Sequence, residues 1–431
     1  MNMPMMSFSM VALAAFLILL GAPMAVGLGL SAIVVVGVFQ PVPNMQIIPQ
    51  LFSEAATSFI LLAVPLFILA GNLMERGTVG RNLIDFTTSI VGWSTGGLGA
   101  FNIVGSMLFG GISGSSLADT ATFGSILVPR MVEDGYPDDY AGAVTLTSSS
   151  LSVVIPPSIL LVLAAASTDQ SVGRALAGGL LPGVLITVAL LIPNYYISKK
   201  HNYGHKIPFS FRNVFNKART CWTALVAPLI ILGSIFSGMV TPTEGAGVAV
   251  LYIVLIDGII FRKLTFTDFI DTFKKTAVLT SAILFIATSS AIANWIIAYD
   301  NIPRFLAQVL SGIPGGKIGF LIMIDILLLL IGMTLDASPA IIIFSPLFLP
   351  IAVNMGIDPT HFIVLMIVGF ALGLTTPPYG VCLFSLSSIT GISMERLVKK
   401  SMPFYVAMFI SLILVTFIPA ISLVVPNLLG M

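Results

Sequence analysis

The sequence predicts an all-α polytopic membrane protein made of two inverted repeats, each with about five transmembrane helices, a re-entrant hairpin and a broken helix. Three observations support this prediction: an apolar composition, two apolar segments interrupted by glycine and serine, and a repeat at constant spacing. Of 431 residues, 57% are hydrophobic and 9% are charged, whereas soluble domains hold about 25% charged residues. A chain this apolar is expected to fold in lipid, and its net charge of +1 argues against a nucleic-acid partner.

Ten segments are candidate transmembrane spans, because about 20 apolar residues cross the hydrocarbon layer. No Lys or Arg precedes Arg76, and a signal peptide needs a basic region at its start. The first apolar segment is therefore expected to be retained as a helix. The candidate spans are residues 8–22, 24–39, 52–75, 139–166, 175–197, 220–239, 242–261, 276–298, 361–390 and 403–428.

Basic residues orient these spans by the positive-inside rule. They gather in segments 199–219, 262–275 and 396–400, which are separated by even numbers of candidate spans and are all expected to be cytoplasmic. Segment 40–50 carries no charge, and the same count places it outside. Both termini are then expected outside the cytoplasm.

Segments 98–129 and 318–350 are apolar at both ends but interrupted in the middle, at 110–116 and 332–338. Each arm is expected to hold about 10–14 helical residues, or about 15–20 Å, which is half the hydrocarbon thickness. We therefore predict two re-entrant hairpins with tips near the bilayer centre. Irregular backbone at that depth is tolerated only where it is buried in protein or lines a cavity.

An internal repeat relates the two halves of the chain. Shifted by 221 positions, Gly111 meets Gly332, Pro129 meets Pro350, and the Pro156-Pro157 pair meets Pro377-Pro378. The predicted halves are residues 1–220, with the broken helix 139–166, and residues 221–431, with the broken helix 361–390. An odd number of spans in each half inverts the second copy, so the first hairpin should enter from the cytoplasm and the second from outside. This architecture is typical of secondary transporters.

The broken elements carry the residues expected to bind ions. Proline removes a backbone donor and frees a carbonyl one turn earlier, and small hydroxyl residues lie beside both proline pairs. Hydroxyl and carbonyl oxygens with little net charge suit Na⁺, so we predict two Na⁺ sites, one per hairpin, with no other metal or cofactor. The predicted Na⁺ ligands are Ser113, Ser115, Ser116, Asp119, Ser148, Ser149, Gly332, Thr334, Asp336, Thr375 and Thr376. The predicted substrate contacts are Ser115, Ser150, Pro156, Pro157, Pro377 and Pro378.

A structural interpretation competes with this one at several positions. Small residues also let membrane helices pack closely. Asp119 and Asp336 look like repeat partners, although they are four positions out of register. A carboxylate costs about 2.5–3.5 kcal/mol in hydrocarbon, so a function is favoured for both residues. Each could instead cap the helix that leaves its hairpin tip. Glu244 is either a helix cap or a contact for an external partner, and Arg304 either meets an anion or faces solvent and headgroups. Asp325 is interpreted as structural or interfacial.

The motifs at these elements resemble those of a known family. Residues 110–129, 154–158, 332–352, 356–362 and 374–384 are similar to the large membrane subunit of tripartite ATP-independent periplasmic (TRAP) transporters. The resemblance covers essentially the whole chain. It implies a multi-pass subunit of the bacterial inner membrane that imports an organic acid, such as sialic acid or another carboxylate, with Na⁺ by an elevator movement. It also implies two partners: a small four-helix membrane subunit, here a separate polypeptide, and a periplasmic substrate-binding protein.

Two other functions are weighed against this one. A stand-alone Na⁺/carboxylate symporter would share the repeats and hairpins but need no binding protein. Residues Gly111 to Gly114 match the GxSG of intramembrane serine proteases, but a nucleophilic serine needs a histidine base within hydrogen-bond reach. The chain has only His201, His205 and His361, none expected beside Ser113. The absence of a phosphate-binding G-x-x-x-x-G-K-[ST] loop argues against an ATP-driven pump, so no enzyme is predicted.

Overall fold

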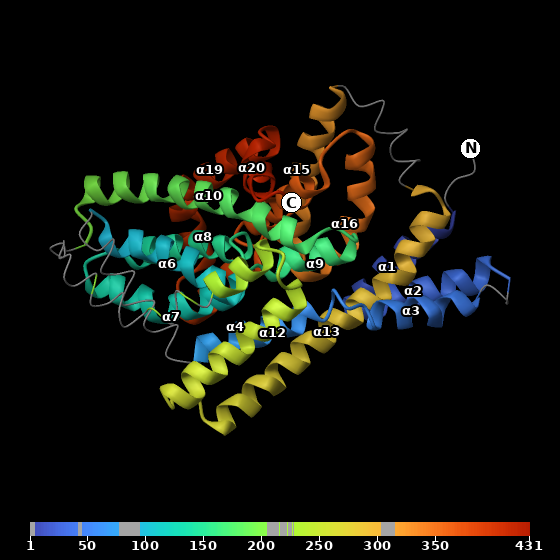
Figure 1. The fold of residues 1–431 in the computed structure, drawn as a ribbon. Coiled ribbons are helices and arrows are strands. Elements are labelled where there is room, and N and C mark those ends of the chain that lie inside the picture. Colours follow the sequence, from blue (N-terminus) through green and yellow to red (C-terminus); the bar gives the residue numbers. More distant parts are fainter. Residues whose placement is uncertain are drawn as a thin grey trace.

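The computed structural model describes residues 5–41, 45–76, 95–204, 215, 222, 226, 228–302 and 315–431. This described part folds into helices joined by short connections and contains no strand (Figure 1). The all-α prediction is therefore confirmed for these residues. Six helices are long and apolar enough to cross a membrane, namely α10, α12 with its continuation to Ile260, α13, α15, α16 and α19.

The first half begins with helices that lead to a hairpin and then to a broken helix. The hairpin is formed by α6 and α7, and the break separates α8 from α9. The bounds are α1 (Met5–Leu19), α2 (Met24–Phe39), α3 (Ile47–Ala56), α4 (Ala63–Arg76), α6 (Gly97–Ser113), α7 (Ser116–Glu133), α8 (Asp138–Ser148), a 3₁₀ turn (Ser149–Val153), α9 (Ile159–Ser167) and α10 (Val172–His201).

The second half repeats this order. Its hairpin is formed by α15 and α16, and its break separates α17 from α18. The bounds are α12 (Pro242–Ile253), continued by a π-helical segment (Val254–Ile260), α13 (Phe266–Tyr299), α15 (Gly316–Thr334), α16 (Ala337–Asn354), α17 (Pro359–Gly373), α18 (Val381–Thr390), α19 (Met394–Phe417) and α20 (Ala420–Leu428).

The repeat predicted from sequence is visible in the helix boundaries. Adding 221 to the bounds of α7 gives those of α16, and the Pro156-Pro157 and Pro377-Pro378 peptide bonds, which share this spacing, are both cis. The two hairpins enter from opposite sides: α6 and α7 lie to the left in Figure 1, and α15 and α16 lie to the upper right. The duplicated, inverted arrangement of hairpins is thus present in the fold. The boundary between halves at residues 220 and 221 stays a prediction.

Helix contacts divide the described chain into two groups. The scaffold group comprises α1 to α4, α12 and α13, and the hairpin group comprises α6 to α10 and α15 to α20. The scaffold group has a small core of its own, in which Met10, Val36 and Ile296 are almost fully buried. The main core runs through the hairpin group and also includes residues of α4, α12 and α13. Every residue of α17 from Thr360 to Gly373 is buried. The groups meet where α4 packs on α6 and α9, and where α13 packs on α16.

The hairpin arms are longer than predicted. They hold 17 to 19 residues, or about 26–29 Å of helix, and not 10–14 residues. Pro129 and Pro350 were interpreted as arm ends, but both lie inside helices, which continue to Glu133 and Asn354. Proline is tolerated within membrane helices because neighbouring groups satisfy the freed backbone. Despite their length, the two arms of each hairpin return to the same side of the molecule (Figure 1).

Three candidate spans also need correction. Segment 52–75 is two helices, α3 and α4, separated at residues 57–62, whereas segment 276–298 is part of a longer helix that begins at Phe266. That start is fixed by a capping box in which the Thr265 and Asp268 side chains each accept a backbone N–H of the other. Segment 403–428 is divided between α19 and α20. In segment 220–239, residues 228–236 are helical, whereas most of the basic loop 199–219 lies outside the described residues.

Two ion pairs connect the repeats within the hairpin group. Arg396, near the start of α19, donates to both carboxylate oxygens of Asp138, at the start of α8, over 2.6 and 3.0 Å. Arg174, near the start of α10, donates over 3.2 Å to Asp358, the N-cap of α17. In each pair, an acidic residue that begins one broken helix meets an arginine of the other repeat. Each broken helix is therefore anchored to the opposite half of the chain.

The Arg396–Asp138 pair should contribute modestly to stability. We expect Asp138→Asn to cost about 0.2–1 kcal/mol, because both side chains are about half exposed and solvent screens such pairs. The hydrogen bonds from Arg396 hold the pKa of the Asp138 carboxyl below its ordinary value. The stabilisation should therefore be present at neutral pH and disappear as pH falls through the lowered pKa. The measurement is the difference in thermal midpoint between wild type and Asp138→Asn across this pH range, and a difference independent of pH would contradict the ionic origin.

Candidate transport site

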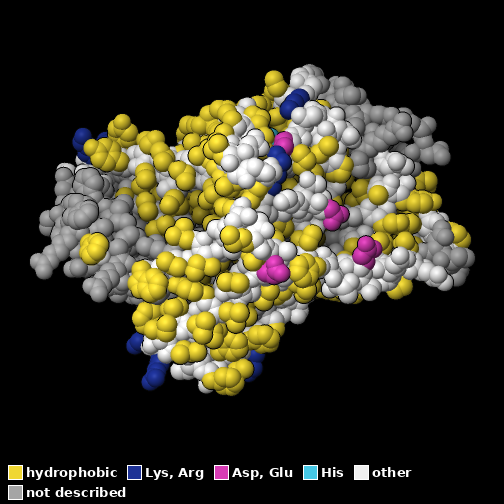
Figure 2. Space-filling view, in the orientation of Figure 1, with side chains coloured by type: hydrophobic (Ala, Val, Ile, Leu, Met, Phe, Trp, Pro, Cys, Tyr) yellow, Lys and Arg dark blue, Asp and Glu magenta, His cyan; other side chains and the backbone are white. Residues whose placement is uncertain are grey.

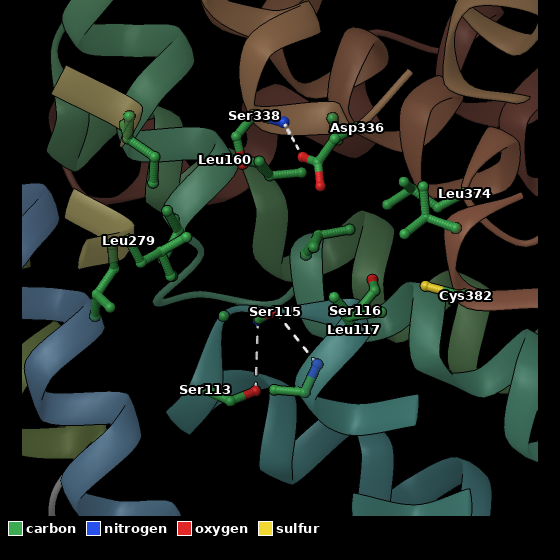
Figure 3. Close-up of a pocket in the computed structure, with 18 of the residues that line it drawn as sticks. Ser113, Ser115, Ser116, Leu117, Leu160, Leu279, Asp336, Ser338, Leu374 and Cys382 are labelled. Carbon is green, nitrogen blue, oxygen red and sulfur yellow. Dashed lines mark hydrogen bonds between the residues drawn. The ribbon is translucent and has the colours of Figure 1, made fainter. Parts of the chain in front are cut away.

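A cavity of about 360 Å³ lies where the tips of the two hairpins face each other. Figure 3 shows Ser113, Ser115 and Ser116 of the first hairpin on one side and Asp336 and Ser338 of the second on the other. Both broken helices add apolar walls, and α4 and α13 of the scaffold group close the remaining side. The additional wall residues include Val153, Ile159, Leu160, Leu374, Val381, Cys382, Ile68, Asn72, Leu279 and Ile283.

The first tip is a tight turn between two helix ends. Gly114 has a φ of 61°, a left-handed conformation that glycine adopts at little cost. Ser115 is the N-cap of α7, and its hydroxyl accepts the backbone N–H of Ala118 over 3.4 Å. A Cβ on Gly114 would lie 3.1 Å from the carbonyl oxygen of Pro157. The tip therefore rests directly on the break between α8 and α9.

The second tip uses an aspartate where the first uses a serine. Asp336 is the N-cap of α16, and its Oδ1 atom accepts the backbone N–H of Ser338 over 2.9 Å. At the 221-residue spacing, Asp336 corresponds to Ser115, and Asp119 corresponds to Ala340. The two aspartates are therefore not repeat partners. Capping is observed for Asp336, whereas Asp119 is fully buried within the first turn of α7, which Ser115 caps.

Both broken helices present backbone and hydroxyl oxygens near the tips. Around the first break, Ser149 and Ser150 donate to carbonyl oxygens of their own helix over 2.8 and 2.7 Å. At the second break, Thr375 and Thr376 do the same over 3.0 Å. A hydroxyl that donates its proton in this way keeps its lone pairs for a cation.

The predicted site residues form two layers. Four of them, Ser113, Ser115, Ser116 and Asp336, line the cavity itself. Ser149 lies one layer behind, within hydrogen-bond reach of the Cys382 thiol. The remaining predicted residues do not line the cavity, namely Asp119, Ser148, Ser150, Gly332, Thr334, Thr375, Thr376, Pro156, Pro157, Pro377 and Pro378. Their roles as ligands or substrate contacts stay predictions.

Close backbone contacts explain part of this second layer. A Cβ on Gly332 would lie 3.1 Å from the Cα atom of Gly373 and 3.2 Å from the carbonyl oxygen of Phe370. Gly332 thus permits α15 to approach α17 without a side chain between them. Gly110 has the same function in the first repeat, where an added Cβ would lie 2.5 Å from the Cα atom of Ser152.

Sequence reasoning missed several lining residues of the cavity, among them Cys382 and Asn72, and a network behind it. Cys382 lines the cavity, although only 1% of its surface is exposed. Asn72 also lines it and donates to Thr276 over 3.0 Å; an asparagine within an apolar helix was the available signal. Behind the cavity, Asn102 of α6 donates to Thr145 over 2.6 Å and accepts from Ser148 over 3.2 Å. This buried network joins the first hairpin to α8.

The weaker partner predictions have separate outcomes. Glu244 forms a capping box at the start of α12, accepting the backbone N–H of Thr241 over 2.7 Å. The structure therefore gives Glu244 a capping role, and a partner contact by this residue stays a prediction. Arg304 lies outside the described residues.

A duplicated helical membrane fold in which two opposed hairpins face a shared cavity is typical of secondary transporters. Comparisons with known proteins agree. Residues 11–421 match the family described as tripartite ATP-independent periplasmic transporter, DctM component. The chain belongs to this family. It is a large permease subunit of a three-part transporter, a multi-pass protein of the bacterial inner membrane, and not an enzyme.

Relatives support the assignment along nearly the full length. The chain is 35% identical over 94% of both chains to the C4-dicarboxylate TRAP transporter large permease protein DctM of Pseudomonas aeruginosa. It is also 35% identical to the sialic acid TRAP transporter large permease protein SiaM of Vibrio cholerae, over 86% of this chain and 87% of that one. The isethionate TRAP transporter permease protein DctMQ of Oleidesulfovibrio alaskensis is 34% identical over 95% of this chain but 64% of its own length.

Solved structures support the fold alone. The YdaH transporter of Alcanivorax borkumensis aligns with a TM-score of 0.59 at 15% identity, over 91% of this chain and 90% of that one. The efflux pump MtrF of Neisseria gonorrhoeae aligns with a TM-score of 0.59 at 13% identity, over 86% of this chain and 82% of that one. The membrane-transporter fold predicted from the sequence is confirmed.

Proposed function

We propose that this chain is the membrane subunit that carries an organic acid across the inner membrane together with Na⁺. The main support is the cavity between the two hairpin tips. Helices α7 and α16 both begin at this cavity, at Ser116 and Ala337, so their N-termini lie at its wall. Free N–H groups at helix N-termini favour anionic ligands.

The substrate class follows from the cavity and from the relatives. The named substrates of the similar permeases are C4-dicarboxylates, sialic acid and isethionate, all of them organic anions. No lysine or arginine is among the described residues that line the cavity. We therefore propose that hydroxyl groups and helix N-termini, and not a basic side chain, bind the acidic group of the substrate.

Na⁺ coupling rests on the chemistry of the oxygen atoms around the tips. Hydroxyls at both breaks donate to nearby carbonyls and retain lone pairs, and Asp336 supplies one carboxylate at the cavity. We propose one Na⁺ site per hairpin, each held between a tip and its broken helix. Each excess positive charge that enters gains about 2.3 kcal/mol per 100 mV of membrane potential, which can drive uptake of an anion.

The two helix groups suggest the movement. The scaffold group has its own small core, and the hairpin group contains both tips and both breaks. We propose an elevator movement in which the hairpin group slides along α4 and α13. Substrate bound between the tips would then face one side of the membrane and afterwards the other.

We also propose two partners. One is a small membrane subunit, in keeping with the three-part description of the family. A periplasmic binding protein would deliver the substrate, as the family's tripartite description suggests.

Uptake into proteoliposomes tests this function. The permease and its small subunit are reconstituted, and uptake of labelled sialic acid, succinate or isethionate is measured with the matching binding protein outside. We expect uptake driven by an inward Na⁺ gradient and stimulated by an inside-negative potential, and none when K⁺ replaces Na⁺. Uptake equally fast in K⁺ would exclude Na⁺ coupling. Uptake of free substrate by the permease without either partner would favour the stand-alone symporter.

A further inference from the structure

A second cavity, of about 300 Å³, lies between the scaffold and hairpin groups. Its walls come from α3 and α13 of the scaffold group, from α16, and from the end of α9. Acidic side chains gather near the middle of the face shown in Figure 2, over the region where α9, α13 and α16 approach each other in Figure 1. The polar residues of this second cavity are Glu54, Ser58, Ser167, Asp169, Ser290 and Asn294.

Its two carboxylates lie at unfavourable positions for helix stability. Glu54 is in the last turn of α3, and Asp169 follows the end of α9 by two residues. The C-terminus of a helix carries partial negative charge, so an acidic residue there is destabilising. Neither helix has a basic residue in its last turn, and neither carboxylate forms an ion pair with a described residue. Two helix ends and two carboxylates thus concentrate negative potential on the cavity.

Asp169 is additionally in a left-handed backbone conformation, with a φ of 54°. Glycine or asparagine would occupy this position after a helix end without adding charge. The stability of the turn after α9 therefore does not explain why residue 169 carries a carboxylate.

An unsatisfied hydroxyl also lines the second cavity. Ser290 of α13 is 1% exposed, and its Oγ atom has no hydrogen-bond partner among the described residues. A buried polar group without a partner is destabilising, because it has lost its hydrogen bonds to water. Asn294, four residues later on the same helix, lines the cavity as well. A ligand with N–H donors would satisfy these oxygens together with the carboxylates.

The internal repeat places different side chains at the corresponding positions. Three of the five counterparts are leucines, and a lysine stands in place of Glu54. None of the five is acidic, so the repeated sequence pattern does not impose the negative charge of this cavity. The counterparts of Glu54, Ser58, Asp169, Ser290 and Asn294 are Lys275, Leu279, Thr390, Leu69 and Leu73.

We propose that the second cavity binds the ammonium or guanidinium group of an organic cation. A volume of about 300 Å³ is roughly ten times that of one water molecule and is at the lower end of small-molecule sites, so a bare metal ion would leave it largely empty. The occupant contacts α3 and α13 on one side and α9 and α16 on the other. It therefore connects the two helix groups, and its effect on transport rests on the proposed elevator movement.

Binding of n-butylguanidinium to the purified full-length permease tests the proposal without Na⁺ or substrate. We expect the probe to raise the thermal midpoint in a saturable way, and its neutral isostere n-butylurea to have no effect. The double variant Glu54→Gln with Asp169→Asn should weaken binding at least tenfold while keeping side-chain shape. Ser290→Leu, which introduces the residue of the inverted copy, should also reduce binding by filling the second cavity. Glu395→Gln, which removes an exposed carboxylate near the start of α19, is the matched control and should bind as wild type does.

Two results would overturn the proposal: no saturable effect on wild type, or equal binding by wild type and the double variant. A second measurement distinguishes the source of the cation. If n-butylguanidinium competes with the periplasmic binding protein for the permease in nanodiscs, the natural ligand is a basic side chain of that partner. If both bind together, the site takes a free organic cation. Because probe binding is measured without Na⁺ or substrate, failure of Na⁺ coupling would leave this result unaffected.

Discussion

Asp336→Asn is expected to raise the Na⁺ concentration for half-maximal uptake at least tenfold while leaving the fold intact. Asparagine keeps a side-chain oxygen that can accept the backbone N–H of Ser338, the contact that Asp336 makes over 2.9 Å. The substitution therefore preserves the N-cap of α16 but removes the one negative charge among the described residues that line the cavity. Uptake as a function of Na⁺ concentration, together with the thermal midpoint, separates ion binding from capping.

The matched comparison is Asp336→Ala, which removes both the charge and the cap. We expect it to lose Na⁺ affinity like Asp336→Asn and, in addition, about 0.5–2 kcal/mol of stability. Wild-type Na⁺ dependence in Asp336→Asn would show that this aspartate only caps the helix. The variant Ser115→Ala, at the corresponding position of the first hairpin, should lose the N-cap of α7 without any change in charge.

Gly373→Ala should nearly abolish uptake because it separates the second hairpin from its broken helix. The added Cβ would lie 2.6 Å from the Cα atom of Gly332 and 2.7 Å from its carbonyl carbon. These are backbone atoms that cannot rotate away, so α15 must shift. Overpacking of this kind costs about 1–3 kcal/mol. We expect at least a tenfold loss of uptake rate and a lower thermal midpoint.

Gly247→Ala is the control for this substitution. Gly247 lies in α12, and an added Cβ there would have no neighbour within 4 Å among the described residues. Alanine in a helix interior is favoured over glycine by about 0.8–1.0 kcal/mol, so this variant should transport normally and be slightly more stable. Normal uptake by Gly373→Ala would contradict the close contact between hairpin and broken helix.

Much of the fold was accessible from sequence because the repeat supplied two independent views of each element. The glycine- and serine-rich interruptions of two apolar segments located both hairpins, and the Pro-Pro pairs located both breaks. Boundaries were less accessible. Pro129 and Pro350 were interpreted as helix ends, although a membrane helix can continue through proline when neighbours satisfy its backbone. The last span was expected to begin at residue 403, but α19 begins at Met394, so Arg396 and Lys399 lie in its first two turns.

The candidate site was predictable only in part. Hydroxyl clusters beside glycine and proline identified the tips, and four tip residues line the cavity. The sequence could not show which tip residue of one repeat faces the other, because that depends on how two inverted copies pack. Cys382 and Asn72 were missed because a single small or polar residue in an apolar segment does not reveal which side it faces.

The ion pairs that connect the repeats have a consequence for biogenesis. Asp138 pairs with Arg396, which follows it by 258 positions. This ion pair of α8 therefore cannot form while the ribosome is still synthesising the first half of the chain. The early hairpin must remain in the bilayer, incompletely packed, until the last helices are inserted. Assembly of this protein is therefore a late event in translation, and fragments that contain only one copy of the duplicated unit should be substrates for membrane quality control.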